Sequence, residues 1–234
     1  MTALTSPPAQ RAGLRLLLAL LGGLVLAVVA VPVALLVRSE YAPLMRLDVR
    51  VTGAAERAVA DSDLLLRLAQ GTTLLGEPLL LTAAAAVLAA VLARQGRRRL
   101  ALYVVAARVG ALVLSSGLKL AVDRSRPVFD EPVATALGGS FPSGHALGSA
   151  AFWTTTAVVL APSVRRPRLL LAGAVVVALL VAASRVLLGV HYLTDVTGGL
   201  LLGLGWAAVL TAVFTAWRAD ERHGPVDPVE EGVA

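Results

Sequence analysis

The stretch LLLAGAVVVALLVAASRVLLGVHYLTD, residues 169–195, decides the fold of this chain. Its first 20 residues, 169–188, are mostly apolar, and this is about the length that an α-helix needs to cross the hydrocarbon core of a bilayer. Polar side chains stand near the end of this segment, at Ser184 and Arg185, and after it, at His191 and Asp195, before another apolar run begins. The stretch therefore predicts a membrane-spanning helix that ends in a cluster of polar residues.

The composition of the whole chain also indicates a membrane protein. Hydrophobic residues make up 57% of the 234 residues and charged residues 15%, and the mean hydropathy is +0.80. A soluble domain does not need so much apolar surface to fill one core. A chain of this length has room for about six spans of roughly 20 residues in one bundle. Cysteine is absent, which excludes disulfides and thiolate metal sites.

The remaining apolar runs complete a predicted all-α integral membrane fold, a six-transmembrane-helix bundle. The first run is longer than the apolar core of a cleaved signal peptide, which has about 7–15 residues, so we expect it to be retained as a helix. Residues 38–71 mix charges with apolar residues at helical spacing, which predicts an extracytoplasmic interfacial segment. Residues 218–234 predict a polar cytoplasmic tail. The six predicted spans are 14–37, 72–93, 100–118, 145–161, 169–188 and 193–217.

The basic residues predict the orientation of this bundle. The net charge is +6, and excess arginine lies near the N-terminus and in two short connections between apolar runs. This placement is typical of membrane topology rather than of a nucleic-acid surface, so no nucleic-acid partner is expected. By the positive-inside rule, both connections and both termini are cytoplasmic, and the polar clusters face the other side of the cell membrane. The arginines of the two connections are Arg94, Arg97, Arg98, Arg99, Arg165, Arg166 and Arg168.

The first polar cluster consists of Lys119, at the end of an apolar run, and Arg126-Pro127. A residue before proline avoids the helical region, so we expect Arg126 to leave the helix and turn back towards Lys119. A guanidinium fork and a compact ammonium charge together suit a phosphate dianion. The alternative is that Lys119 pairs with Asp123 and that Arg126 reaches lipid headgroups. Arg124 is expected at most to tune Lys119, not to act in catalysis.

The second polar cluster, Pro142-Ser143-Gly144-His145, stands directly before a long apolar run. Ser143 is the predicted N-cap of that helix. Free amides at a helix start, a cap hydroxyl and a glycine that allows close approach together form a cradle for an anion. His145 would stand beside this cradle and could give a proton to a leaving oxygen. The alternative is a capping turn whose histidine has no chemical role.

The third polar cluster contains His191 and Asp195, four residues apart, and Arg185. On a helix this spacing places the carboxylate on the same face as the imidazole, where it can fix the tautomer and leave the other nitrogen as a nucleophile. The pair could instead be half of a metal site. The sequence offers no obvious third ligand nearby, and the cations of the other clusters would repel a metal ion, so no metal is expected.

Together, the patterns Lys-x6-Arg-Pro, Pro-Ser-Gly-His and Ser-Arg-x5-His-x3-Asp resemble the three-part signature of the type 2 phosphatidic acid phosphatase superfamily. The resemblance implies that His191 attacks phosphorus to form a phosphohistidine and that Asp195 orients it. It also implies that His145 protonates the leaving group and later activates water, with no metal or cofactor. The residues that it implies for binding the phosphate oxygens are Lys119, Arg126, Ser143, Gly144 and Arg185.

The sequence thus predicts a metal-independent phosphatase for a lipid-linked phosphate or diphosphate, with the lipid tail in the bilayer. Polyprenyl diphosphate, phosphatidic acid and phosphatidylglycerol phosphate are all compatible with the pattern. Two alternatives stay open: a lipid phosphotransferase that uses the same intermediate, and a non-catalytic lipid-phosphate binding or transport protein. Because His191 must be neutral while His145 is protonated, we expect a bell-shaped pH profile. Arg108, inside the third span, is expected to be structural.

Overall fold

The regular secondary structure of the described residues is helical. A computed structural model describes residues 17, 20–24, 28, 31–130 and 132–221, and these ranges contain no strand. Residues 31–38 are helical, and a short 3-10 turn at Ala161–Ser163 joins α6 to α7. The labelled helices are α2 (Ala42–Ala60), α3 (Asp63–Leu74), α4 (Pro78–Arg94), α5 (Arg98–Val122), α6 (Gly144–Leu160), α7 (Pro167–Leu187) and α8 (Leu193–Glu221).

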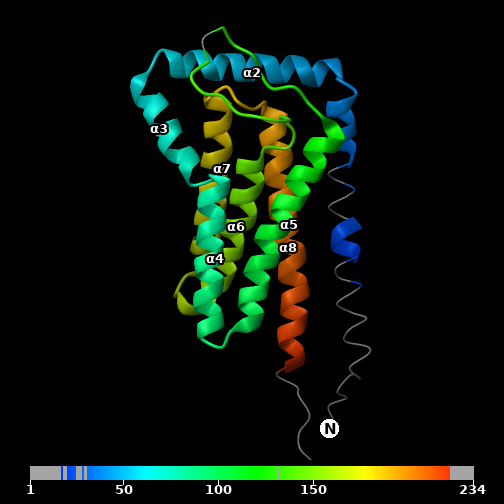
Figure 1. Ribbon diagram of the computed structural model, residues 1–234, viewed down its shortest axis with the longest axis vertical. Helices are drawn as coiled ribbons and strands as arrows, with labels where there is room; N and C mark the ends of the chain where they lie inside the picture. Colours follow the sequence, from blue (N-terminus) through cyan, green and yellow to red (C-terminus); the bar gives the residue numbers. More distant parts are fainter. Residues whose placement is uncertain (1–16, 18–19, 25–27, 29–30, 131, 222–234) are drawn as a thin grey trace, which may run out of the picture.

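Helices α4 to α8 run along the long axis of the molecule and form one bundle (Figure 1). Helix α6 lies at the centre of this bundle and contacts α4, α5, α7 and α8. Helix α2 lies across one end of the bundle, in contact with α7 and α8, and α3 slants from α2 towards the start of α4. The long segment 123–143 covers the same end (Figure 1). We call this end of the molecule the α2 end.

The described part of the chain carries four segments that are long and apolar enough to cross a membrane. They are Asp63–Arg94, Arg98–Val122, Pro167–Leu187 and Leu193–Thr215. The central helix α6 is shorter, at 17 residues. Of the first predicted span, 14–37, the structure describes residues 17, 20–24, 28 and 31–37, and these are helical. These findings confirm an all-α membrane protein.

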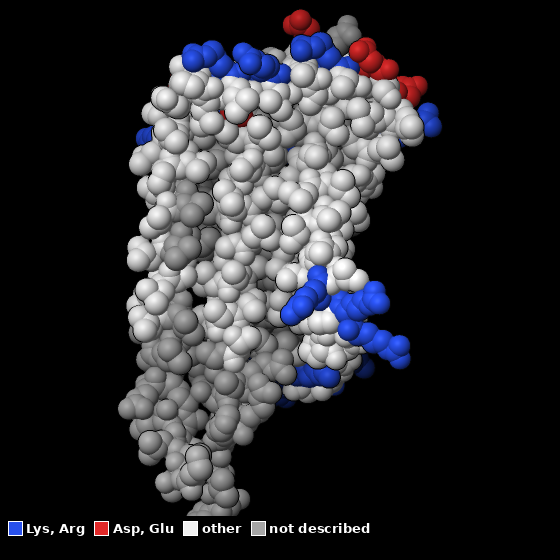
Figure 2. Space-filling view, turned by 180° about the vertical axis from the view of Figure 1, so that it is seen from behind, with Lys and Arg blue, Asp and Glu red and all other residues white. Residues whose placement is uncertain are grey.

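The outer surface has the charge distribution of a membrane protein. Figure 2 shows a broad uncharged band between charged side chains at the two ends of the molecule. Large apolar side chains of the long helices are exposed as well, such as Leu79 of α4 and Val113 of α5, which are 77% and 65% exposed. In water such exposure would be unfavourable, but lipid tails are as apolar as these side chains.

Helices α5 to α8 lie close to the predicted spans, whereas the predicted span 72–93 is divided in two. Helix α3 ends at Leu74 and α4 begins at Pro78. Proline lacks the N–H that would continue the preceding helix but is favoured in the first turn of a new one. At the other end of the chain, α8 continues to Glu221, beyond the predicted end at 217. The rest of the predicted polar tail, 222–234, lies outside the described residues.

Two glycines of α8 bring its backbone close to α6. A Cβ atom at Gly199 would lie 2.7 Å from the carbonyl oxygen of Ser143, and one at Gly203 would lie 2.4 Å from that of Leu147. Both distances are below van der Waals contact, so only glycine allows this approach. The N–H of Ser143 also donates to the carbonyl oxygen of Asp195 at 3.0 Å. The starts of α6 and α8 are therefore fixed side by side at the α2 end.

Candidate active site

The three polar clusters of the sequence meet around one cavity at the α2 end. This cavity has a volume of about 290 Å³. Helix α5 ends at Val122, and the left-handed φ of 47° at the next residue, Asp123, turns the chain out of the helix, so that Arg126 can return to the side of Lys119. The residues of the predicted site that line the cavity are Lys119, Arg126, Gly144, His145, Arg185 and His191.

The imidazole of His191 presents one ring nitrogen to the cavity side and the other to Asp195. Its Nε2 lies 3.2 Å from a terminal nitrogen of Arg126, and its Nδ1 lies 3.5 Å from Asp195 Oδ2. A guanidinium can only donate hydrogen bonds, so Nε2 is the acceptor and the ring proton is on Nδ1. This is the tautomer in which Nε2 carries a lone pair, as a nucleophile requires.

Burial keeps the imidazole of His191 neutral. The side chain is only 2% exposed. Loss of water around the charged form lowers the pKa of His191 from 6.5 to about 4, although the carboxylate of Asp195 opposes this shift. At neutral pH the ring is therefore uncharged.

Asp195 lies behind the imidazole, and polar groups from three parts of the chain bind its carboxylate. The Ser140 hydroxyl and the N–H of Tyr192 donate to Oδ2, the latter at 2.8 Å. A terminal nitrogen of Arg124 donates to Oδ1 at 2.6 Å. Asp195 is fully buried and does not line the cavity. Asp195 therefore contacts His191 and not the cavity.

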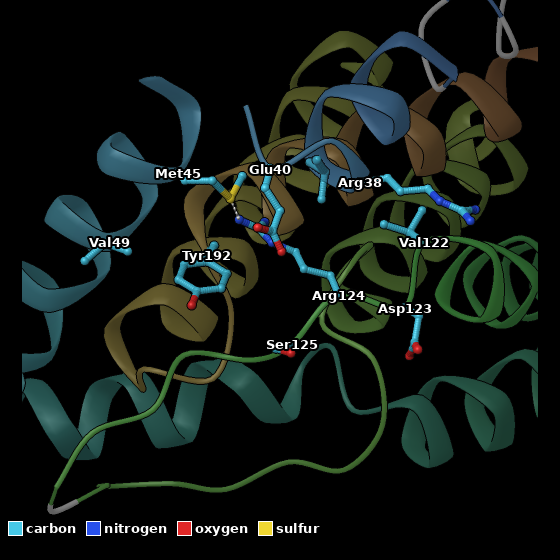
Figure 3. Close-up of a pocket in the computed structure, with 10 residues that line it drawn as sticks. Arg38, Glu40, Met45, Val49, Val122, Asp123, Arg124, Ser125 and Tyr192 are labelled. Atoms are coloured by element: carbon cyan, nitrogen blue, oxygen red, sulfur yellow. Dashed lines mark hydrogen bonds between the residues drawn. The ribbon is translucent and has the colours of Figure 1, made fainter. Parts of the chain in front are cut away.

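Arg124 also binds Asp48 of α2, which no sequence pattern indicated. The second terminal nitrogen of Arg124 lies 2.7 Å from Asp48 Oδ2, and the N–H of Thr194 donates to Asp48 Oδ1 at 2.9 Å. Figure 3 shows Arg124 reaching Met45 of α2 beside the ring of Tyr192, whose centroid lies 4.2 Å from the guanidinium carbon. Arg124 does not tune Lys119, as the sequence suggested, but links α2 to Asp195.

His145 stands at the cavity with Glu77 as its partner. Its Nε2 lies 3.1 Å from Glu77 Oε2, at the break between α3 and α4. An ionised carboxylate only accepts, so Nε2 of His145 carries a proton in this arrangement. The side chain of Glu77 is 43% exposed, so a ligand can displace it. Within the described ranges, no three acidic or histidine side chains are grouped as metal ligands would be.

Two of the predicted phosphate-binding cations have free donors. The structure records no hydrogen bond or ion pair between the Lys119 ammonium and any described residue, and Lys119 does not pair with Asp123. Arg185 donates to Thr73 Oγ1 at 2.8 Å, while its buried Nε has no partner in the described chain. Buried polar groups are normally hydrogen-bonded, so an unpaired guanidinium nitrogen beside a cavity indicates a place for an anion.

Arg126 differs from the other two cations because all five of its N–H groups are already engaged. One donates to Nε2 of His191, and the other four donate to main-chain oxygens at 2.8–3.2 Å. These oxygens belong to Leu137, Gly138, Gly139 and Val190. Arg126 therefore holds segment 137–139 against the start of α8, and it can reach a phosphate only by releasing one of these bonds.

Of the two neighbouring residues predicted to bind phosphate, Ser143 caps α6 and Gly144 lines the cavity. The hydroxyl of Ser143 accepts from the N–H of Ala146 at 3.5 Å, which is the predicted N-cap, and the residue is fully buried. Ser143 does not line the cavity, whereas Gly144 does. At the cavity, the start of α6 thus presents the backbone of Gly144 rather than the hydroxyl of Ser143.

The residues that the sequence did not reveal are Asp48, Glu77 and Ser140. Each contacts a motif residue more than 50 positions away in the sequence. Of these three residues, only Ser140 lies near a sequence motif, because it comes shortly before the second polar cluster. The other two lie in segments without a motif.

Comparison with known proteins agrees with this geometry. The model of the PAP2 superfamily matches residues 99–219. Phosphatidylglycerophosphatase B of Bacillus subtilis is 38% identical over 96 residues, which are 39% of this chain and 47% of that protein. Lipid A 1-phosphatase of Rhizobium etli is 34% identical over 113 residues, 44% and 45% of the two chains. The matches thus span about half the length of these two relatives.

Longer similarities include a mycobacterial protein and a crystal structure. Decaprenylphosphoryl-5-phosphoribose phosphatase of Mycobacterium tuberculosis is 33% identical over 180 residues, 75% of this chain and 94% of that protein. The crystal structure of a transmembrane PAP2 type phosphatidylglycerolphosphate phosphatase from Bacillus subtilis superimposes with a TM-score of 0.72 at 26% identity, covering 85% and 96% of the two chains. With its motifs gathered around one cavity and more than half of its length matched by the family, this chain belongs to the PAP2 superfamily.

Proposed function

We propose that this protein is an integral membrane phosphatase that hydrolyses a lipid-linked phosphate or diphosphate through a phosphohistidine on His191. The observation that carries the proposal is the orientation of this neutral imidazole, with Nδ1–H towards Asp195 and the lone pair of Nε2 towards Arg126. Lys119 and Arg185 supply unpaired donors at the same cavity. The names of the relatives, all phosphatases of lipid or lipid-linked phosphates, support the same substrate class.

The chemistry follows from these positions. The hydrogen bond from Arg126 leaves Nε2 of His191, and Nε2 forms a bond to phosphorus. The bond from phosphorus to the leaving oxygen breaks, and this oxygen takes the Nε2 proton from the doubly protonated ring of His145, in place of Glu77. The neutral His145 then removes a proton from water, and the water oxygen bonds to phosphorus as the bond from phosphorus to Nε2 of His191 breaks, which releases phosphate and restores His191. Lys119, Arg185 and the Gly144 amide stabilise the negative charge that spreads over the equatorial oxygens, as phosphoryl transfer requires.

The proposal includes six spans, cytoplasmic termini and a site at the outer face of the membrane. The arginines of the α4–α5 and α6–α7 connections are at the end opposite the site, which supports this orientation by the positive-inside rule. The chain has no cysteine, so single cysteines can report sidedness. In intact cells, an impermeant maleimide should label Val128→Cys but not Gln95→Cys. The reverse pattern would refute the outer-face site.

The main experiment is phosphate release from a panel of lipid phosphates by the purified full chain, with EDTA present. We expect wild-type protein to hydrolyse at least one lipid, His191→Gln to be inactive, and acid-labile ³²P to appear on wild-type protein alone. If the label were transferred mainly to an added alcohol, the protein would be a phosphotransferase. If folded wild-type protein bound these lipids without releasing phosphate, it would be a binding protein.

The role of His145 has a separate test. A nitrophenyl leaving group needs little help from an acid, whereas an alkyl alcohol needs a proton. His145→Ala should therefore lose about 10²–10⁴-fold in rate with an alkyl phosphate and much less with p-nitrophenyl phosphate. Equal losses with both substrates would refute the assignment of His145 as the acid.

A further inference from the structure

The catalytic cavity contains a fourth cation, Arg108 of α5, which none of the three motifs includes. Arg108 lines the cavity together with Lys119, Arg126 and Arg185, and it is only 5% exposed. Its Nε donates to Thr82 Oγ1 at 2.9 Å and one terminal nitrogen donates to the carbonyl oxygen of Pro78 at 2.6 Å. The other terminal nitrogen, Nη1, has no recorded hydrogen bond or ion pair with the described residues.

Arg108 lies on the His145 side of the cavity. Pro78 directly follows Glu77, the partner of His145, so the two contacts share one short segment. A Cβ atom at Gly148 would lie 3.0 Å from Nη1 of Arg108. Gly148 stands three residues after His145 in α6, about one helical turn further along the same face. The unpaired nitrogen therefore lies near the histidine that faces the leaving group.

Cations outnumber carboxylates around the cavity. Its lining residues include the four cations named above, while the carboxylates beside it are Glu77, which binds His145, and Asp195, which binds Arg124. Buried cations in a membrane-spanning bundle are unfavourable unless a counter-ion is present, so the cavity is suited to an anion. The cavity volume of about 290 Å³ corresponds to roughly ten water-sized groups, which is more than a single phosphate fills.

We infer that Arg108 forms a second anion subsite, which binds the phosphate group next to the one that His191 attacks. This inference rests on the proposed function and specifies its substrate class as a lipid diphosphate. In that reaction the bond from phosphorus to the bridging oxygen breaks as Nε2 of His191 bonds to the terminal phosphorus. The bridging oxygen takes the proton from His145, and Arg108 holds the lipid monophosphate that leaves.

The test compares farnesyl diphosphate with farnesyl monophosphate on the full chain in detergent, because the two substrates share one tail. For Arg108→Gln, the ratio of kcat/KM for diphosphate to kcat/KM for monophosphate should fall about 10- to 100-fold, the size of one charge-assisted hydrogen bond. Arg108→Lys should restore part of this ratio. A ratio within threefold of wild type in Arg108→Gln would overturn the inference, whether both rates fell together or neither fell.

The matched control is Thr82→Val, which removes one structural bond of Arg108 but keeps its charge in the cavity. If Arg108 only tied α5 to α4, Thr82→Val would lower the diphosphate preference as Arg108→Gln does. We expect it to change the ratio less than twofold, and a fall equal to that of Arg108→Gln would overturn the inference.

A binding measurement separates this inference from the proposed function. Inorganic diphosphate should raise the unfolding midpoint of wild-type protein more than the same concentration of inorganic phosphate, and Arg108→Gln should abolish this difference. If wild-type protein hydrolysed neither ester but kept an Arg108-dependent preference for diphosphate, the phosphatase would be wrong and the subsite would stand. If diphosphate stabilised both proteins equally, the subsite would be wrong even in an active phosphatase.

Discussion

Asp48 of α2 and Asp195 of α8 are bound by the same guanidinium, that of Arg124, at 2.7 and 2.6 Å. Both carboxylates are fully buried. Two negative charges in such a place would repel each other without the cation between them. Asp195, which contacts His191, is therefore linked through Arg124 to Asp48 of α2, the helix that lies across the end of the bundle.

Replacement of Arg124 by methionine should destabilise the protein strongly and lower kcat. Arg124→Met keeps much of the side-chain volume but leaves two buried carboxylates without a cation, and removal of one partner of a buried ion pair costs about 3–5 kcal/mol. The measurements are the unfolding midpoint in detergent and the rate of phosphate release. Arg38→Met is the matched control, because Arg38 makes one exposed hydrogen bond, to the carbonyl oxygen of Ala121 at 2.7 Å. A midpoint for Arg124→Met equal to that of Arg38→Met would show that the bridge contributes nothing.

The histidines allow a direct test of the pKa of His191. The chain has only three, so ¹⁵N spectra of histidine-labelled protein can be assigned with His191→Gln. We expect the His191 ring to stay neutral, with the proton on Nδ1, until the pH falls to about 4. A titration near the ordinary value of about 6.5 would contradict this prediction.

The same shift predicts how stability depends on pH. The unfolded chain binds a proton at His191 below about 6.5, whereas the folded chain does so only below about 4. Between these values the unfolded state holds more protons, so the contribution of His191 to stability falls as the pH falls through this window. His191→Gln should remove this contribution, which thermal unfolding at several pH values can measure.

Lys119 and Arg126 should respond differently to mutation, although the motif treats them alike. Lys119 has no recorded bond to the described chain, so Lys119→Ala should lower activity by about 10²–10³-fold with an unchanged unfolding midpoint. Arg126 donates to four carbonyl oxygens, and the three donors of a lysine cannot replace its fork. Arg126→Lys should therefore lower both activity and the midpoint, and should expose segment 137–139 to proteases. An unchanged protease pattern would show that Arg126 does not hold this segment.

The close approach of α6 and α8 predicts opposite effects for two glycine substitutions. A Cβ atom at Gly203 would lie 2.4 Å from Leu147 O, so Gly203→Ala must push the helices apart and should cost about 1–3 kcal/mol. A Cβ atom at Gly173 of α7 would meet nothing within 4 Å, so Gly173→Ala should be neutral or stabilising by up to about 1 kcal/mol. Thermal unfolding of both variants in one detergent decides between these outcomes. Equal midpoints would mean that the α6–α8 contact adapts to an added methyl group.

The sequence predicted the parts of the molecule that depend on local pattern. The limits of α5, α6 and α7 follow from apolar runs, and three of the four cavity cations, Lys119, Arg126 and Arg185, follow from the spaced motifs. It could not predict that Asp48 meets Arg124, because this contact depends on how α2 lies across the bundle. It also could not predict that Arg126 donates hydrogen bonds to four carbonyl oxygens, because segment 123–143 has no periodic pattern that would reveal its path.

The contact between α6 and α8 has a consequence for motion. His145 lies in the first turn of α6, and His191 lies just before α8, whose first turn contains Asp195. Backbones that touch at Gly199 and Gly203 fluctuate together, so the distance between the two histidines should vary little on any timescale shorter than unfolding. If His191 and His145 act as proposed, their spacing is set by the fold before a lipid arrives, and it is the headgroup that must adjust to fit it.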